Sequence, residues 1–180
     1  MNIVTEEKIK PAHTHTLAGR VCFNISTKST QFFIKHRILY YILQFTWGLP
    51  RTVFGGLLAL IAFILKLCGL KVHFGKYFWI GYAKIGPDYW GGLDTGLFFF
   101  RDQKSVDFDL RSHEWGHTFQ NLWLGPLFIF LVAIPSAIRW WIDWFKQKKT
   151  GKGIDYEAFW AEDAATVCGA WAVKVLQAKN

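Results

Sequence analysis

A five-residue stretch, His113 to His117, constrains the fold of this chain more than any other, because it has the pattern H-E-x-x-H. On a helix, residues four apart lie one turn above each other on the same face, so both imidazoles can bind one metal ion. Glu114 then lies beside the ion, where its carboxylate can take a proton from water whose pKa a zinc ion has lowered. The pattern predicts a helix with two zinc ligands, His113 and His117, and a catalytic base, Glu114. The simpler alternative is a helix with two surface histidines and a solvated glutamate.

A third protein ligand has to come from elsewhere in the chain. Catalytic zinc sites use three protein ligands and leave the fourth position for water. The metzincin extension of the motif is excluded, because Gln120 and Trp123 stand where its glycine and its third histidine would be. The remaining ligand must therefore follow later in the sequence.

Glu162 is the predicted third ligand. It lies one turn inside a helix predicted from Tyr156 to about Gln177, among apolar neighbours, where an acid is costly unless it binds something. Glu157 remains the alternative, although an acid at the start of a helix is favoured by the helix dipole alone.

Two further features of this region are informative. Gln120 or Asp163 could orient a ligand histidine from behind, although spacing does not decide between them. Small residues form a patch on the last helix that would let another helix approach closely: Ala164, Ala165, Cys168, Gly169 and Ala172.

The composition indicates association with a membrane. The chain has 10 Trp, 6 Tyr and 17 Phe in 180 residues, and Trp and Tyr collect where protein meets lipid headgroups. The net charge of +8 is spread along the chain without a nucleic-acid-binding motif. We therefore expect a lipid bilayer, rather than nucleic acid, as a partner.

The chain divides into a polar arm, residues 1–36, expected to be loosely ordered, and one membrane-associated domain, residues 37–180. Residues 37–70 form a predicted apolar helical anchor. Within it, Thr52–Leu70 is close to the ~20 residues that span a bilayer, and Lys66 is near enough to its end to reach the headgroups. The preceding apolar piece is broken by Gly48, Pro50 and Arg51 and is expected to be an interfacial or half-spanning helix.

Residues 71–110 carry aromatic runs separated by glycine, which predicts a small antiparallel β-meander. Within it, Gly96–Arg101 could be an edge strand that aligns a peptide by main-chain hydrogen bonds, and plain β packing is the alternative.

Residues 111–180 contain the predicted metal-site helices. The first begins near Asp109 or Ser112 and runs to about Leu124. His117 and Glu162 must meet at one ion, so the apolar run between them has to leave and return on the same side. The interruption at Pro135 and Ser136 is therefore expected to be the corner of a helical hairpin, and the basic residues 146–153 a mobile loop.

The motifs together resemble a group of small, largely uncharacterised bacterial membrane proteins. The residues that carry the resemblance are His113-Glu-Trp-Gly-His-Thr-Phe-Gln, Leu124-Gly-Pro-Leu, Ile134-Pro-Ser and Phe159-Trp-Ala-Glu. In that group the corresponding patterns are HE-aromatic-GH-(S/T)-x-Q, LGPLY, LPS and aromatic-x-T-E. The resemblance implies a gluzincin-like zinc site with Glu162 as its last ligand, in the bacterial inner membrane. The chain departs from the pattern at Ala161, where threonine is common, and at Thr166, where gluzincins such as thermolysin carry an aspartate.

The sequence thus predicts an α+β fold with a zincin-like metal helix, N-terminal membrane helices and a C-terminal ligand helix. The predicted activity is zinc-dependent hydrolysis of a peptide or protein substrate by His113, His117 and Glu162 with Glu114 as base. The alternative is a non-catalytic membrane protein whose zinc site is structural or vestigial.

Overall fold

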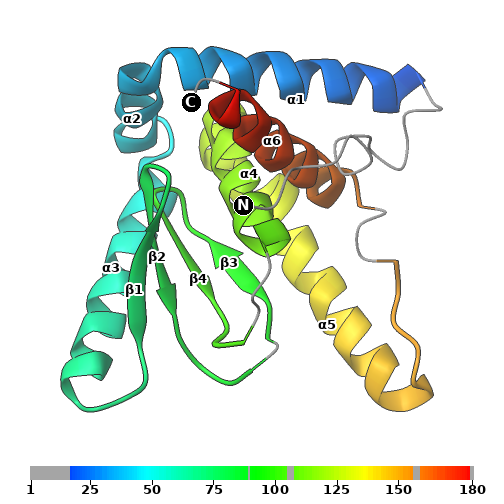
Figure 1. Cartoon of the computed structure of the whole chain (residues 1–180). Coiled ribbons are helices and arrows are strands. Elements are labelled where there is room, and N and C mark those ends of the chain that lie inside the picture. The colour runs from blue at the N-terminus through cyan, green and yellow to red at the C-terminus, as the bar shows by residue number, and fades with distance from the viewer. Residues whose placement is uncertain (1–16, 89, 105–107, 156–158, 179–180) are drawn as a thin grey trace.

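A computed structural model describes residues 17–88, 90–104, 108–155 and 159–178 as an α+β fold (Figure 1). In chain order the regular helices and strands are α1 (Leu17–Lys35), α2 (Arg37–Phe45), α3 (Leu49–Leu67), β1 (His73–Tyr77), β2 (Ile80–Lys84), β3 (Gly92–Asp94), β4 (Phe98–Arg101), α4 (Phe108–Leu124), α5 (Ile134–Thr150) and α6 (Trp160–Gln177). A 3₁₀ turn (Gly125–Leu127) and a π-helical turn (Ile129–Ala133) join α4 to α5.

The four strands form a mixed sheet in the order β1-β2-β4-β3. β1 pairs with β2 and β3 pairs with β4 in antiparallel fashion, whereas β2 and β4 run parallel. The expected antiparallel meander is therefore wrong at its centre. After β2 the chain bends back, with the Trp90 indole N–H donating to the Ile85 carbonyl, and β3 takes the outer position, so β4 enters beside β2.

The expected edge strand is also corrected. Residues 98–101 form β4, whose two neighbours are β2 and β3, so no free edge remains on it. The edge strand next to the helix α4 is β3. A short glycine-led strand carries little β-propensity of its own, which is why the Phe-rich segment gave the stronger signal.

Helices cover both faces of the sheet. Adjacent residues of β4 point to opposite faces, so Phe99 and Phe100 belong to different apolar clusters. Phe100 packs with Ala62 of α3, and Phe99 lies in the main core with Trp115 and Phe119 of α4. The sheet thus separates the apolar helix α3 from the helix that carries the H-E-x-x-H pattern (Figure 1).

The described part of the polar N-terminal segment is helical rather than loosely ordered. α1 lies across the end of the molecule over α6 (Figure 1), and Phe33 and Ile34 at its end are buried in the main core. The hydroxyls of Thr27 and Ser29 donate to carbonyls one turn back, at Phe23 and Ile25. Such local bonds satisfy the polar side chains within the helix, so tertiary packing overrides their weak helix propensity.

The corner after α4 lies ten residues before the expected position. The helical segments before and after residue 128 meet at 113°, at the Gly125-Pro126 turn, where Gly125 has φ of +52°. Pro135 lies in the first turn of α5, where a missing N–H disrupts little, so the chain continues without a corner. The expected basic loop is also mostly helix, because α5 continues to Thr150 and ends at Gly151 in the left-handed conformation.

α3 is the one helix within the described ranges that is by itself long and apolar enough to cross a membrane. It has 19 residues, and most of its apolar side chains are exposed rather than packed inside the molecule. Pro50 occupies its first turn, so the break expected at that position is instead the beginning of this helix.

Candidate metal centre

Close packing of α4 against α6 brings the candidate metal-binding residues together. Two glycines allow it: a Cβ on Gly116 would lie 1.8 Å from the Ala165 carbonyl oxygen, and a Cβ on Gly169 would lie 1.8 Å from that of Ser112. The buried small residues of α6 confirm the predicted close approach. The helix backbones therefore meet almost in contact beside His113 and His117.

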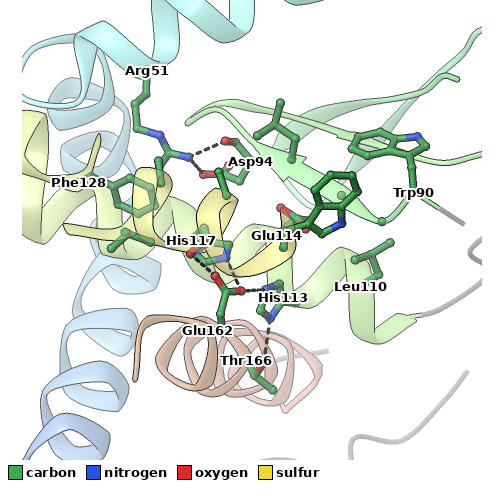
Figure 2. Close-up of a pocket in the computed structure, with 18 of the residues that line it drawn as sticks. Arg51, Trp90, Asp94, Leu110, His113, Glu114, His117, Phe128, Glu162 and Thr166 are labelled. Atoms are coloured by element: carbon green, nitrogen blue, oxygen red, sulfur yellow. Dashed lines mark hydrogen bonds and ion pairs between the residues drawn. The ribbon is translucent and has the colours of Figure 1, made fainter. Parts of the chain in front are cut away.

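The three predicted ligands converge on one point (Figure 2). The Glu162 Oε2 atom lies 3.0 Å from His113 Nε2 and 3.5 Å from His117 Nε2, and the donor atoms of all three residues lie within 4.8 Å of one another. Zinc bonds of about 2.0–2.2 Å in tetrahedral geometry place neighbouring ligand atoms about 3.3–3.6 Å apart. The two separations between an imidazole nitrogen and the carboxylate lie close to this range, so the group could hold a metal ion. The alternative ligand, Glu157, lies outside the described residues.

Each histidine has a partner on its other ring nitrogen. His117 Nδ1 donates to Gln120 Oε1 over 2.7 Å, and the Gln120 amide donates in turn to the Ala161 carbonyl over 2.6 Å. His113 Nδ1 lies 2.8 Å from the Thr166 hydroxyl. Such bonds fix the ring orientation and the tautomer that leaves Nε2 for a metal. Of the two residues expected to orient a histidine, Gln120 does contact His117, and the Thr166 hydroxyl contacts His113.

The second oxygen of Glu162 is held by a different helix. The Ser136 hydroxyl of α5 donates to Glu162 Oε1, which leaves Oε2 toward the histidines. The sequence does not predict this contact, because Pro135-Ser136 has the pattern of a corner. The signal that could have found it is the Pro135-Ser136 pair at the start of a helix, where a hydroxyl is available to bind neighbouring side chains.

Charges in this cluster shift one another's pKa. Burial raises the pKa of Glu162, but hydrogen bonds with His113 and His117 and the charges of their rings outweigh it and hold this pKa far below its usual range. Burial lowers the pKa of His117, but the hydrogen bond and the charge of Glu162 raise it overall to about 9. The opposite directions of the two shifts mean that the protonated imidazole and the ionised carboxylate stabilise each other.

Glu114 lies beside the cluster without belonging to it. Its side chain is 5% exposed, and burial raises its pKa to about 7, although the neighbouring imidazoles act in the opposite direction. The carboxylate lies against β3, where a Cβ on Gly92 would be 2.3 Å from Glu114 Oε1. A general base with a pKa near neutrality is partly protonated at physiological pH, so it can both accept and return a proton.

A buried ion pair closes the opposite side of the site and was not foreseen from the sequence. Arg51 Nη2 donates to both the carboxylate and the carbonyl oxygen of Asp94, over 2.6 and 2.5 Å, and the guanidinium carbon lies 3.6 Å from the centre of the Phe128 ring (Figure 2). Burial raises the pKa of Asp94, and the charge of Arg51 opposes this shift. The pair ties the beginning of α3 to the edge strand β3. Its one sequence signal is a lone arginine inside an apolar run.

A pocket of about 680 Å³ opens beside the cluster. Gly92 and Leu93 of β3 form one side, and Ser136, Ala137 and Trp140 of α5 form the other. His113, Glu114, His117 and Glu162 all line it. The candidate ligands and the candidate base therefore face a space large enough for part of a peptide.

Comparison of the chain with protein-family models, with curated proteins and with solved structures finds no match. The chemistry of the site itself therefore indicates what it can do. Three residues could hold a metal ion next to the acid Glu114, and all four line an open pocket.

Proposed function

We propose that this protein is a membrane-associated zinc metallopeptidase with a gluzincin-like site. The observation that carries the proposal is the convergence of His113, His117 and Glu162 beside a pocket that Glu114 also lines. Two imidazoles and one carboxylate form a ligand set used by catalytic zinc, which leaves a coordination position for water. A structural site is instead closed by four protein ligands, and among the described residues this group has three, which favours catalysis over the non-catalytic alternative.

Zinc in such a site supplies Lewis acidity, which lowers the pKa of water and polarises a carbonyl group. Glu114 accepts the proton of the attacking water and later returns it to the leaving amine. Gln120, Thr166 and Ser136 hold the ligand side chains in place during these steps. The low exposure of Glu114 limits competition from bulk water for its proton.

The edge strand β3 provides a place for an extended peptide. Within the described ranges it is paired on one side only, with β4, and Gly92 and Leu93 line the pocket. Arg51 already donates to the Asp94 carbonyl, so a peptide would add to this edge beside Gly92, close to Glu114. This support comes from β3 rather than from the segment 96–101 that the sequence favoured.

The membrane part of the proposal rests on α3 and on the aromatic composition. α3 has the length and hydropathy of a bilayer-crossing helix, and its exposed apolar side chains need a non-aqueous neighbour.

The substitution Glu114→Gln tests the catalytic role. Reconstituted full-length protein should hydrolyse a quenched fluorescent peptide library, and the variant should lose about 10²–10⁴-fold of this activity while keeping its zinc, because the ligands are unchanged. Zinc is measured by elemental analysis of the same samples. Asp88→Asn serves as the matched control, since Asp88 pairs with Lys104 on the surface, away from the pocket. A zinc-replete Glu114→Gln protein with full activity would refute the role of Glu114.

A further inference from the structure

Helix α5 has two chemically different faces. Ser136, Trp140 and Asp143 follow one another at helical spacing and line the pocket. Ile138, Trp141 and Phe145 follow the same spacing on another face, with exposed fractions of 53%, 51% and 60%. Every residue of α5 is at least partly exposed. The helix is therefore a wall one helix thick, with the pocket on one side and an uncovered apolar face on the other.

The charged residues of α5 before its last turns are engaged by the segment that follows the helix. Arg139 donates to the Asp155 carbonyl over 2.6 Å, and the Asp143 carboxylate accepts from the Ile154 backbone over 2.6 Å. The outer face of α5, near Arg139 and Asp143 in the sequence, consists of exposed and uncharged residues: Ile134, Ile138, Trp141, Ile142 and Phe145. An apolar stripe of this kind is costly in water and indicates a surface that is normally covered.

The end of α5 indicates what covers it. The helix ends in a cluster of positive charge formed by Lys146, Lys148, Lys149 and Lys152. Just before these lysines come Trp144 and Phe145, and the Lys148 ammonium lies 4.4 Å from the centre of the Trp144 ring. Aromatic rings followed by lysines match the boundary between acyl chains and anionic headgroups.

We propose that the outer face of α5 docks into an anionic lipid leaflet, with Ile138, Trp141 and Phe145 among the acyl chains and the terminal lysines at the headgroups. A second copy of the chain fits this face less well, because parallel packing of two such helices would bring their lysine clusters together. The lipid contact follows from the surface of α5 alone and requires neither metal nor hydrolysis.

This contact places the pocket at the membrane. A helix with its side chains is about 10 Å across, so lipid on one side of α5 lies about that distance from the residues on the other. If the proposed function holds, the substrates are peptide segments that lie at the lipid surface. The same helix also carries Ser136, which holds Glu162, so the membrane supports a helix that positions a metal ligand.

Nitroxide labels measure the lipid contact directly. In a background with alanine at Cys22, Cys68 and Cys168, single labels are placed at Ile138 and Phe145, with Ile25 of α1 as control because its exposed fraction, 54%, matches that of Ile138. The full-length protein is studied in nanodiscs of phosphatidylcholine, with and without phosphatidylglycerol. The α5 labels should collide with oxygen in preference to a water-soluble nickel complex, and more strongly so with phosphatidylglycerol, whereas the label at Ile25 should show the reverse preference.

Three results would overturn the proposal. They are water exposure of the α5 labels in both kinds of disc, equal lipid exposure of Ile25 and Ile138, and dipolar broadening between α5 labels that indicates a second copy. Equal depth in both discs would overturn the anionic headgroup assignment. A second measurement avoids the cysteine background and follows quenching of tryptophan fluorescence by brominated lipid. The Trp141→Phe variant should be quenched less than the unmodified chain, and Trp171→Phe on α6 should be quenched as much as the unmodified chain. Identical quenching in both variants would contradict docking through α5.

Discussion

The pair α4–α6 and the helix α5 both contribute to the candidate metal centre, but they are held in place very differently. α4 and α6 meet backbone to backbone at Gly116 and Gly169, and ten residues of α6 are buried. α5 has no buried residue and meets the centre through Ser136. The candidate metal ligands thus lie on densely packed helices, whereas one wall of the pocket is formed by a helix with few contacts of its own.

The difference in packing matches two different requirements, fixed ligand positions and a pocket wall that can move. Ligand positions have to be kept within tenths of an ångström, which dense packing achieves. A pocket wall that admits a substrate benefits from being able to move, and regions with few buried apolar contacts open at low cost in free energy. A membrane at the outer face of α5 would supply the support that the protein itself does not.

Of the substitutions that test the difference between α4–α6 and α5, Gly116→Ala should have the largest effect on stability. The added Cβ would lie 1.8 Å from a backbone carbonyl of α6, so the two helices must separate. We expect a loss of about 3 kcal/mol or more in unfolding free energy, together with loss of metal binding. The measurement is denaturant unfolding of the purified protein in detergent.

Gly56→Ala is the matched control, since a Cβ at this position in α3 meets nothing within 4 Å. It should leave stability unchanged or raise it by up to about 1 kcal/mol through helix propensity. Equal stability of the two variants would show that the backbone contact between α4 and α6 is not close.

Thr166→Val and Ser136→Ala compare two hydrogen-bond partners of the candidate ligands, one on the densely packed α6 and one on the loosely packed α5. Each removes one hydroxyl that contacts a candidate ligand, from α6 and α5 respectively. We expect zinc affinity to fall about 10–100-fold for Thr166→Val and about tenfold or less for Ser136→Ala, because α5 yields more easily. Competition with a chelator of known affinity measures both.

The control for these two variants is Thr46→Val, which removes a hydroxyl bonded within its own helix region, at Ile42. Its zinc affinity should equal that of the unmodified protein. A larger loss from Ser136→Ala than from Thr166→Val would mean that α5 is as firmly placed as α6.

Ile142→Ala should have the smallest effect. Ile142 is 50% exposed on α5, so its truncation in detergent should change unfolding free energy by no more than about 0.5 kcal/mol. Val167→Ala on α6 removes a side chain that is 2% exposed and should cost about 2 kcal/mol. Equal costs at the two positions, measured by denaturant unfolding, would remove the distinction between the helices.

Local patterns in the sequence were sufficient for the centre of the site. H-E-x-x-H fixes two ligands by helix geometry, and the convergence of Glu162 with them follows from an acid among apolar neighbours and a small-residue patch. Arg51 and Asp94 could not be paired in the same way, because they are 43 residues apart and nothing local links them.

Two of the errors in the fold arise from non-local packing, and the third from a proline that a helix can accommodate. Strand order in a mixed sheet depends on non-local pairing, so the parallel contact between β2 and β4 has no signature in either strand. The segment of α1 is helical because of its packing on α6, against the propensity of its Ser and Thr residues. Pro135 resembled a corner, but a proline in the first turn of a helix is compatible with a continuous chain.

Elemental analysis of the purified full-length protein tests the central claim, that α4 and α6 hold a metal ion between His113, His117 and Glu162. We expect about one zinc ion per chain, and none in His113→Ala, while His36→Ala at the α1–α2 junction keeps it. A protein without metal after purification in zinc, or a His113→Ala variant that binds as much zinc as the unmodified chain, would contradict the account.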